Sequence, residues 1–169
     1  MEIIYGGGAS FILRGSKSVS IDGGDADISL FTRRQKRAAL KLNGPGEYEV
    51  GGVLITTLDS AGTLMHSITL DDVNVVHLSG SGSLTDRDLA AIGRTDVLLV
   101  RADDLRAAQA AVADLSPRVV IPFGTHAAAL AASVGIKNPE PQRSFTWNGS
   151  GTPPKAALLK EPGARRKAA

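Results

Sequence analysis

Short apolar runs separated by glycine-rich breaks dominate the first half of the chain. The runs are rich in Ile, Val and Leu, alternate in part with polar residues, and end at turn-forming residues, which is the pattern of β-strands. We expect strands at residues 2–5, 10–14, 18–22, 28–31, 38–43, 48–50, 53–58, 66–70 and 73–78. The dipeptide Asp71-Asp72 indicates a hairpin turn between the last two. The nearly continuous apolar run 73–78 is typical of a strand that is covered on both faces.

The pattern changes at Thr85, after which helical and buried-strand segments alternate. Residues 85–93 begin with an N-cap candidate, carry acids in the first turn and end at a glycine. Residues 103–115 repeat apolar positions at intervals of three and four, which predicts one helix face. An alanine-rich helix is expected at 126–135, buried strands at 96–100 and 118–123, and weak strands at 144–147 and 156–160.

Length and composition indicate one globular domain with an aliphatic core. The 169 residues are 43% hydrophobic but only 4% aromatic, so Val, Ile, Leu and Ala must supply most of the packing. We place the domain at residues 1–160 and interpret residues 161–169 as a basic flexible tail. No membrane span or signal peptide is apparent, so we expect a cytoplasmic protein of bacterial type. A net charge of +2 is too small to indicate nucleic-acid binding.

The histidines do not form a recognisable metal motif. There is no cysteine, and none of the three histidines is paired with another at a ligand spacing. His77 lies in an apolar strand, so we expect a core histidine that is satisfied by a hydrogen bond. We expect His66 to be a polar rim residue where a strand begins, and His126 to be a capping or surface residue at a helix start.

Two further polar clusters have a simple structural interpretation beside a chemical one. Asp22, Asp25 and Asp27 could act in acid–base chemistry or bind a hard cation, but "DGGDAD" also has the composition of a turn in which Asp accepts backbone hydrogen bonds. The run "HLSGSGSLT" places serines near His77 and could form a nucleophile pair or cradle a phosphate. It lacks the flanking pattern of a nucleophile elbow, and a flexible connection is the simpler interpretation.

Several stretches resemble the metallo-β-lactamase fold, in particular its short bacterial branch of zinc-dependent hydrolases related to the ascorbate-phosphate lactonases. The stretches are "EIIYGGGASFIL" (2–13), "SIDGGDADISLFT" (20–32), "GPGEYEVGGVLIT" (44–56), "VVHLSGSGSLTDRDLAAIGRTDVLLV" (75–100) and "LSPRVVIPFGTH" (115–126). The resemblance spans residues 2–160 and implies an αββα sandwich of two mixed β-sheets with helices outside. The helices are fewer and shorter here, so we expect thinned helical layers that leave apolar sheet surface for a partner.

The resemblance also implies a centre of two zinc or manganese ions, but its ligand positions have been lost. A loop of the form H-x-H-x-D-H would follow Thr32, with further ligands in the first glycine loop and after later strands. The positions that correspond to ligands hold Gly8, Arg33, Gln35, Arg37, Ala38, Gly80 and Gly124. Arginine has no acceptor lone pair and would repel a cation, and glycine offers only backbone. No metal cofactor is therefore expected.

Three functions follow from this loss. The first is a non-catalytic member of the fold, a pseudoenzyme acting as a binding or structural subunit. The second is a metal-dependent hydrolase of lactonase or phosphodiesterase type with rearranged ligands, drawn from His77, His126, Asp22 and Asp59. The third is a metal-free anion-binding module that uses the basic loop residues Arg33, Arg34, Lys36 and Arg37. The partner stays open between a second copy of the chain, another protein and an anionic small molecule.

Overall fold

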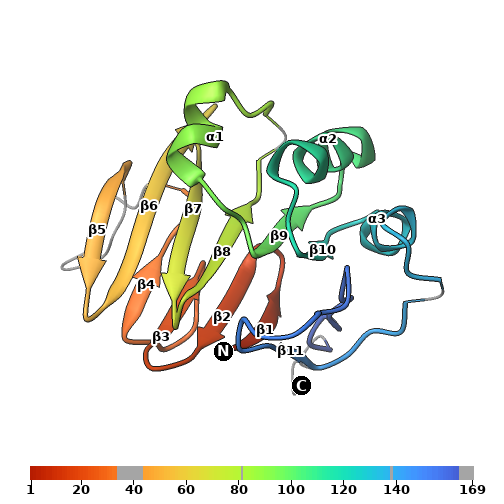
Figure 1. The fold of residues 1–169 in the computed structure, drawn as a ribbon, viewed down its shortest axis with the longest axis horizontal. Helices are drawn as coiled ribbons and strands as arrows, with labels where there is room; N and C mark the ends of the chain where they lie inside the picture. The colour runs from red at the N-terminus through yellow and green to blue at the C-terminus, as the bar shows by residue number, and fades with distance from the viewer. Residues whose placement is uncertain (34–43, 81, 138, 164–169) are drawn as a thin grey trace, which may run out of the picture.

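The computed structural model describes residues 1–33, 44–80, 82–137 and 139–163, and it has two packed β-sheets with helices on one side (Figure 1). The first sheet has five strands in the order β11-β1-β2-β3-β4. Its strands are β1 (Glu2–Gly7), β2 (Ser10–Arg14), β3 (Ser18–Ile21), β4 (Ile28–Leu30) and β11 (Ser144–Thr146). β3 and β4 are parallel and the other pairs are antiparallel, so the sheet is mixed.

The second sheet has six strands in the order β10-β9-β8-β7-β6-β5. Its strands are β5 (Gly46–Val50), β6 (Val53–Ser60), β7 (Thr63–Leu70), β8 (Val73–Leu78), β9 (Val97–Arg101) and β10 (Val119–Phe123). The hairpin between β7 and β8 turns at Asp71 and Asp72, which both have positive φ, as expected for a tight two-residue turn. β8, β9 and β10 run parallel, because a helical segment connects each to the next.

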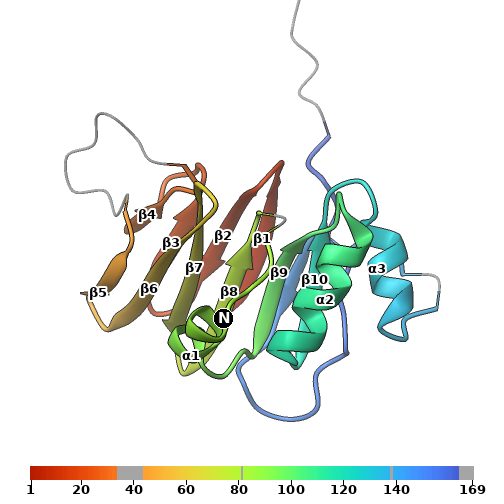
Figure 2. The ribbon, with the colours of Figure 1, turned by 90° about the horizontal axis from the view of Figure 1, so that it is seen from above.

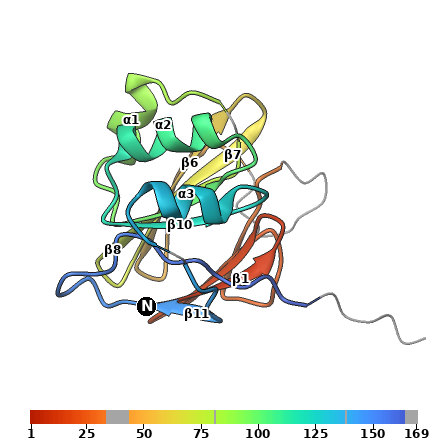
Figure 3. The same ribbon diagram turned by 90° about the vertical axis from the view of Figure 1, so that its right-hand side faces the viewer.

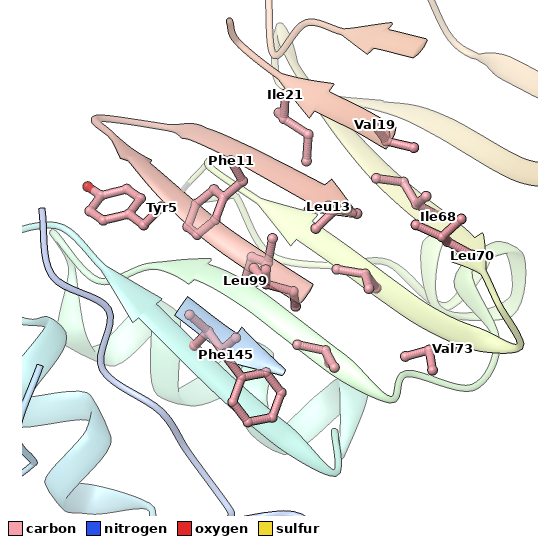
Figure 4. Packing of buried hydrophobic residues seen from close by; sticks show 14 of the residues in the cluster. Tyr5, Phe11, Leu13, Val19, Ile21, Ile68, Leu70, Val73, Leu99 and Phe145 are labelled. Carbon is pink, nitrogen blue, oxygen red and sulfur yellow. The ribbon is translucent and has the colours of Figure 1, made fainter. Parts of the chain in front are cut away.

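The main core lies between the two sheets (Figure 4). In most strands alternate residues point inward, as the period of two requires, and bury their side chains almost completely; the edge strand β5 has no fully buried residue. Ile3, Phe11 and Leu13 come from the five-stranded sheet, and Val97 and Leu99 lie opposite them in the six-stranded sheet. Aliphatic side chains fill most of this layer, as the composition predicted.

The three helices of the described residues all pack on the outer face of the six-stranded sheet (Figure 3). They are α1 (Asp86–Ile92), α2 (Leu105–Leu115) and α3 (Ala127–Ser133). A capping box between Thr85 and Asp88 begins α1, and Gly93 ends it, as the sequence indicated. The outer helical layer is thus thin, and in the described residues it covers one sheet only.

The helical layer is also uneven along that sheet. Seen from above, α2 and α3 lie beside β9 and β10, whereas β5 at the far edge has no helix over it (Figure 2). The weak strand expected at 156–160 forms only isolated bridges, from Ala156 to Val120 and from Leu159 to Gln142. No helix in the described ranges is long and apolar enough to cross a membrane.

Candidate functional site

The candidate site is one end of the sandwich, where the loops after β1, β3, β4, β8, β9 and β10 meet; we call it the mouth. Two adjoining pockets open there and share Arg101. The first, here the Arg33 pocket, has a volume of about 430 Å3 and is lined by Ala9, Asp22, Gly23, Phe31, Thr32, Arg33 and Arg101. The second, here the Glu161 pocket, has a volume of about 420 Å3 and includes Tyr5, Gly8, Asp103, Gly124, Thr125 and Glu161.

Polar side chains cross the inner face of the six-stranded sheet where the apolar core ends. His66 on β7 pairs in register with His77 on β8, and Phe123 on β10 pairs with Arg101 on β9. The imidazole of His77 stacks on the Phe123 ring with a centroid distance of 5.6 Å and an interplanar angle of 9°. We call these four residues, His66, His77, Arg101 and Phe123, the floor of the mouth.

His66 is fully buried, and the expectation that it is a polar rim residue is wrong. β7 begins three residues earlier, at Thr63, so His66 falls inside the strand on its inward face. Nε2 lies 3.1 Å from the carbonyl oxygen of Phe31, and Nδ1 lies 3.0 Å from Oγ1 of Thr57. Because a carbonyl can only accept, Nε2 must carry the proton and Nδ1 must accept from the threonine hydroxyl. Burial lowers the pKa of His66 to about 4.

His77 is a core histidine, as expected, but the expected hydrogen bond is absent. Neither ring nitrogen has a hydrogen-bond partner among the described residues, and the side chain is fully buried. Burial, with a smaller contribution from neighbouring His66, lowers the pKa of His77 to about 3, and the Ala9 backbone opposes this shift only in part. The hydroxyl of Ser79 is likewise buried without a partner in the described structure, so the two do not form a nucleophile pair.

Asp22 and Asp27 are loop residues that organise the connection between β3 and β4. Both oxygens of Asp22 accept from Thr32, one from its backbone N–H at 2.8 Å and the other from its hydroxyl. Asp27 accepts from the N–H and the hydroxyl of Ser18, both at 2.8 Å, and these bonds lower its pKa. The segment is a loop, as the turn interpretation predicted, but Asp22 and Asp27 accept from Thr32 and Ser18 and not from the backbone of the turn itself.

A network of Arg101, Asp103 and Thr125 lies at the mouth, and sequence reasoning did not identify it. The Arg101 guanidinium donates to Asp103 with an Nη1–Oδ2 distance of 3.1 Å. Asp103 Oδ1 accepts from the N–H of Thr125 at 2.8 Å and from its hydroxyl at 3.1 Å. The Thr125 N–H, followed by the Arg101 and Thr125 side chains, lowers the pKa of Asp103, which therefore stays ionised at neutral pH.

This network occupies the space in front of Gly124, to which the sequence resemblance assigns the last metal-ligand position. A Cβ atom on Gly124 would lie 2.4 Å from Asp103 Oδ1, and its φ of 92° disfavours any side chain. Gly80 is different, because a Cβ there would meet Thr63 only at ordinary contact distance, 3.5 Å. A Cβ on Gly8 would meet nothing within 4 Å. The three glycine positions therefore differ in how much room they leave for a ligand side chain.

The other positions aligned with metal ligands are only partly described. Arg33 is exposed and lines the Arg33 pocket. Arg34, Gln35, Lys36, Arg37 and Ala38 lie outside the described residues, as does the strand expected at 38–43. His126 precedes α3, is exposed and makes no capping hydrogen bond.

The described residues contain no group of three or more His, Cys, Asp or Glu side chains that could hold a metal ion. The set proposed for a rearranged hydrolase, which draws on His77, His126, Asp22 and Asp59, therefore does not form a metal site in that part of the chain. At the mouth, Asp103 is engaged by Arg101 and Thr125 and Asp22 is engaged by Thr32, which leaves Glu161 as the other carboxylate lining these pockets. This donor set does not fit a dinuclear centre, which needs several unengaged carboxylate or imidazole ligands.

The fold matches a solved structure over nearly its whole length. A protein from Thermotoga maritima, described as a "putative zn-dependent hydrolase of the metallo-beta-lactamase superfamily", superposes with a TM-score of 0.75 at 19% identity. The match covers 94% of this chain and 97% of that one. No protein-family model and no curated protein sequence matches the chain. The chain therefore has the metallo-β-lactamase fold, an α/β sandwich of two mixed sheets, as its motifs indicated.

Proposed function

We propose that this chain is a non-catalytic member of the metallo-β-lactamase fold, which acts as a binding or structural subunit without a dinuclear metal centre. The observation that carries the proposal is the network at the mouth. Asp103 lies where a side chain at Gly124 would have to pass, and Arg101 and Thr125 engage both of its oxygens. A metal ligand at that position would first have to displace an ion pair.

The charges around the network support the same proposal. Arg101 and Arg33 bring two positively charged guanidinium groups to the mouth, and neither can be a metal ligand because a guanidinium has no acceptor lone pair. The two buried histidines are also poor ligands for a metal at the mouth. His66 already uses both ring nitrogens, and His77 is stacked beneath Phe123. The scaffold is intact, so it can present its surfaces to a partner without catalysing a reaction.

Metal analysis of untagged protein tests the proposal. The protein would be expressed in medium supplemented with zinc and manganese, purified without a metal-affinity step, and measured by elemental mass spectrometry. We expect far less than one metal ion per chain, and no increase in Tm when zinc or manganese chloride is added. A ligand that binds the native state must raise Tm, so the second measurement is independent of losses during purification. One or two retained ions per chain, with a matching rise in Tm, would show that the proposal is wrong.

A further inference from the structure

We propose that the Arg33 pocket binds the oxyanion group of a small molecule, a carboxylate or a phosphate, through the guanidinium of Arg101. The inference rests on the proposed function, because it requires the mouth to be free of metal. It differs from recognition by the basic loop alone, since its main donor comes from the end of a buried strand in the other sheet.

Arg101, which lines the pocket, has a hydrogen-bond donor without a partner in the described structure. Its guanidinium carries five N–H groups, and Asp103 accepts from Nη1. Nε is buried and has no hydrogen-bond partner among the described residues. The side chain keeps 35% of its surface exposed and lines both pockets of the mouth. A buried donor without an acceptor is unfavourable, so an oxygen acceptor there would be stabilising.

The guanidinium is held in a defined orientation, which favours directed binding. Its Cζ lies 5.4 Å from the centroid of the Phe123 ring, and Phe123 is itself stacked on His77. Asp103 fixes Nη1 from one side, and Thr125 fixes Asp103. A planar fork held in this way can bind a carboxylate or a phosphate through two parallel hydrogen bonds.

Arg33 adds a second cation from the opposite side of the same pocket. It follows β4 in the five-stranded sheet, whereas Arg101 ends β9 in the six-stranded sheet. The pocket volume of about 430 Å3 suits a small metabolite and is too small for a macromolecular partner. Two arginines from different sheets therefore line one space of the right size.

Asp22 is the group that opposes anion binding in this pocket. Its carboxylate lines the pocket, although both oxygens accept hydrogen bonds from Thr32. Asp22 and Asp103 formally balance Arg33 and Arg101, so the attraction must come from directed N–H donors and not from net charge. Removing the charge of Asp22 should therefore strengthen binding. Asn suits the position because it tolerates the positive φ of 52° found there.

The test is an NMR titration of the full chain at constant ionic strength, with inorganic phosphate in one arm and sodium acetate in the other. The Nε–H resonance of Arg101 and the backbone amides of residues 22–24 and 101–103 report on the pocket. We expect a saturable shift in at least one arm, and the arm that saturates identifies the class of oxyanion. Asp22→Asn should tighten binding severalfold. Arg101→Lys keeps the charge but lacks the fork, so it should weaken binding at least tenfold.

Arg14→Lys is the matched control, because Arg14 ends β2 outside both pockets with 60% of its side chain exposed, and the substitution should leave the titration unchanged. Linear shifts that are identical in wild type and Arg101→Lys would overturn the inference, since they indicate an adventitious ion only. If the protein is free of metal but no shift saturates, the inference fails and the proposed function stands. If the protein retains stoichiometric metal, the proposed function itself fails.

Discussion

The same strands form the interior of the sandwich and its mouth. Apolar side chains fill the interior, whereas charged and polar side chains line the mouth. Along the inner face of β9, Val97 and Leu99 are fully buried among apolar neighbours, and Arg101 on the same face reaches the pockets. On β8, Val75 in the core is followed on that face by His77, which has no hydrogen-bond partner in the described structure. The interior is thus built by apolar packing, whereas the described residues of the mouth form an ion-pair and hydrogen-bond network. The fold and the chemistry of the mouth therefore depend on different residues, so one can change while the other is kept.

The largest expected change in the free energy of unfolding comes from a comparison of a packed residue in the interior with a charged residue at the mouth. Phe11 is fully buried and its ring contacts those of Tyr5, Phe123 and His77. Phe11→Ala should lower the free energy of unfolding by about 3–5 kcal/mol, as measured by urea denaturation. Arg33→Ala should change it by less than about 0.5 kcal/mol, because Arg33 is exposed. A similar loss in both variants would contradict the distinction.

The next effect concerns the buried histidines, whose pKa values of about 4 and about 3 lie below the ordinary 6.5. Between pH 6.5 and about 4 the unfolded chain binds protons that the folded chain does not, so stability must fall as the pH falls through this window. At pH 5.5 the two histidines together should lower the free energy of unfolding by about 2–3 kcal/mol relative to pH 7.5. Urea unfolding at several pH values would measure this change.

Substitution can separate the contributions of the two histidines to the pH dependence of stability. His77→Leu should remove about half of the pH dependence with little loss of stability at pH 7.5, because no hydrogen bond is broken. His66→Leu should remove the other half but destabilise the protein at every pH, since Thr57 and Phe31 lose their partner. If stability did not depend on pH between 6.5 and 4.5, burial of neutral imidazoles would not explain the floor of the mouth.

The interior could be predicted from the sequence because its signals are local and repeated. Strand periodicity, the Asp71-Asp72 turn and the Thr85 cap each depend on neighbouring residues, and all three are present in the structure. His66 was misplaced because an apolar window does not fix the first residue of a strand, which the turn at Ala61 and Gly62 sets.

The mouth could be predicted only in part, because its contacts join residues that are distant in sequence. The sequence resemblance predicted that ligand residues are missing there, but it did not predict the network of Arg101, Asp103 and Thr125. One signal was available but not used: Arg101 follows Val97 and Leu99 at the strand period of two, which places a charge at the inward end of a buried strand. Its contact with Asp103 and the position of Asp103 in front of Gly124 depend on backbone angles that no motif specifies.

A smaller change in stability is expected at Gly124 and Gly80, two positions that the sequence resemblance assigns to metal ligands. The prediction tests whether a side chain is excluded at Gly124 and tolerated at Gly80. Gly124→Ala should destabilise by about 2 kcal/mol, because its backbone is left-handed and Asp103 lies in the way. Gly80→Ala should change stability by less than about 0.5 kcal/mol, since the added carbon meets Thr63 at an ordinary distance. Thermal unfolding of the two variants gives the comparison.

The steric part of the Gly124 effect can be isolated with a second substitution. In an Asp103→Ala background the added methyl group no longer meets a carboxylate, so Gly124→Ala should cost less than in wild type. The loss of stability that remains in this background measures the backbone strain alone. An unchanged cost would mean that Asp103 does not block the position, which would weaken the argument against a metal ligand there.

The smallest expected effect concerns the polar contact between Thr32 and Asp22, at the edge of the Arg33 pocket. Thr32→Val keeps the side-chain shape but removes the hydroxyl that donates to Asp22, and it should lower the free energy of unfolding by about 1 kcal/mol. Thr32→Ser keeps the hydroxyl and should lose less, as measured by urea denaturation. Because the freed carboxylate oxygen would then face the pocket, Thr32→Val should also weaken phosphate or acetate binding. If serine and valine were equally destabilising, the methyl group would be what matters at Thr32, and this edge of the mouth would resemble the interior.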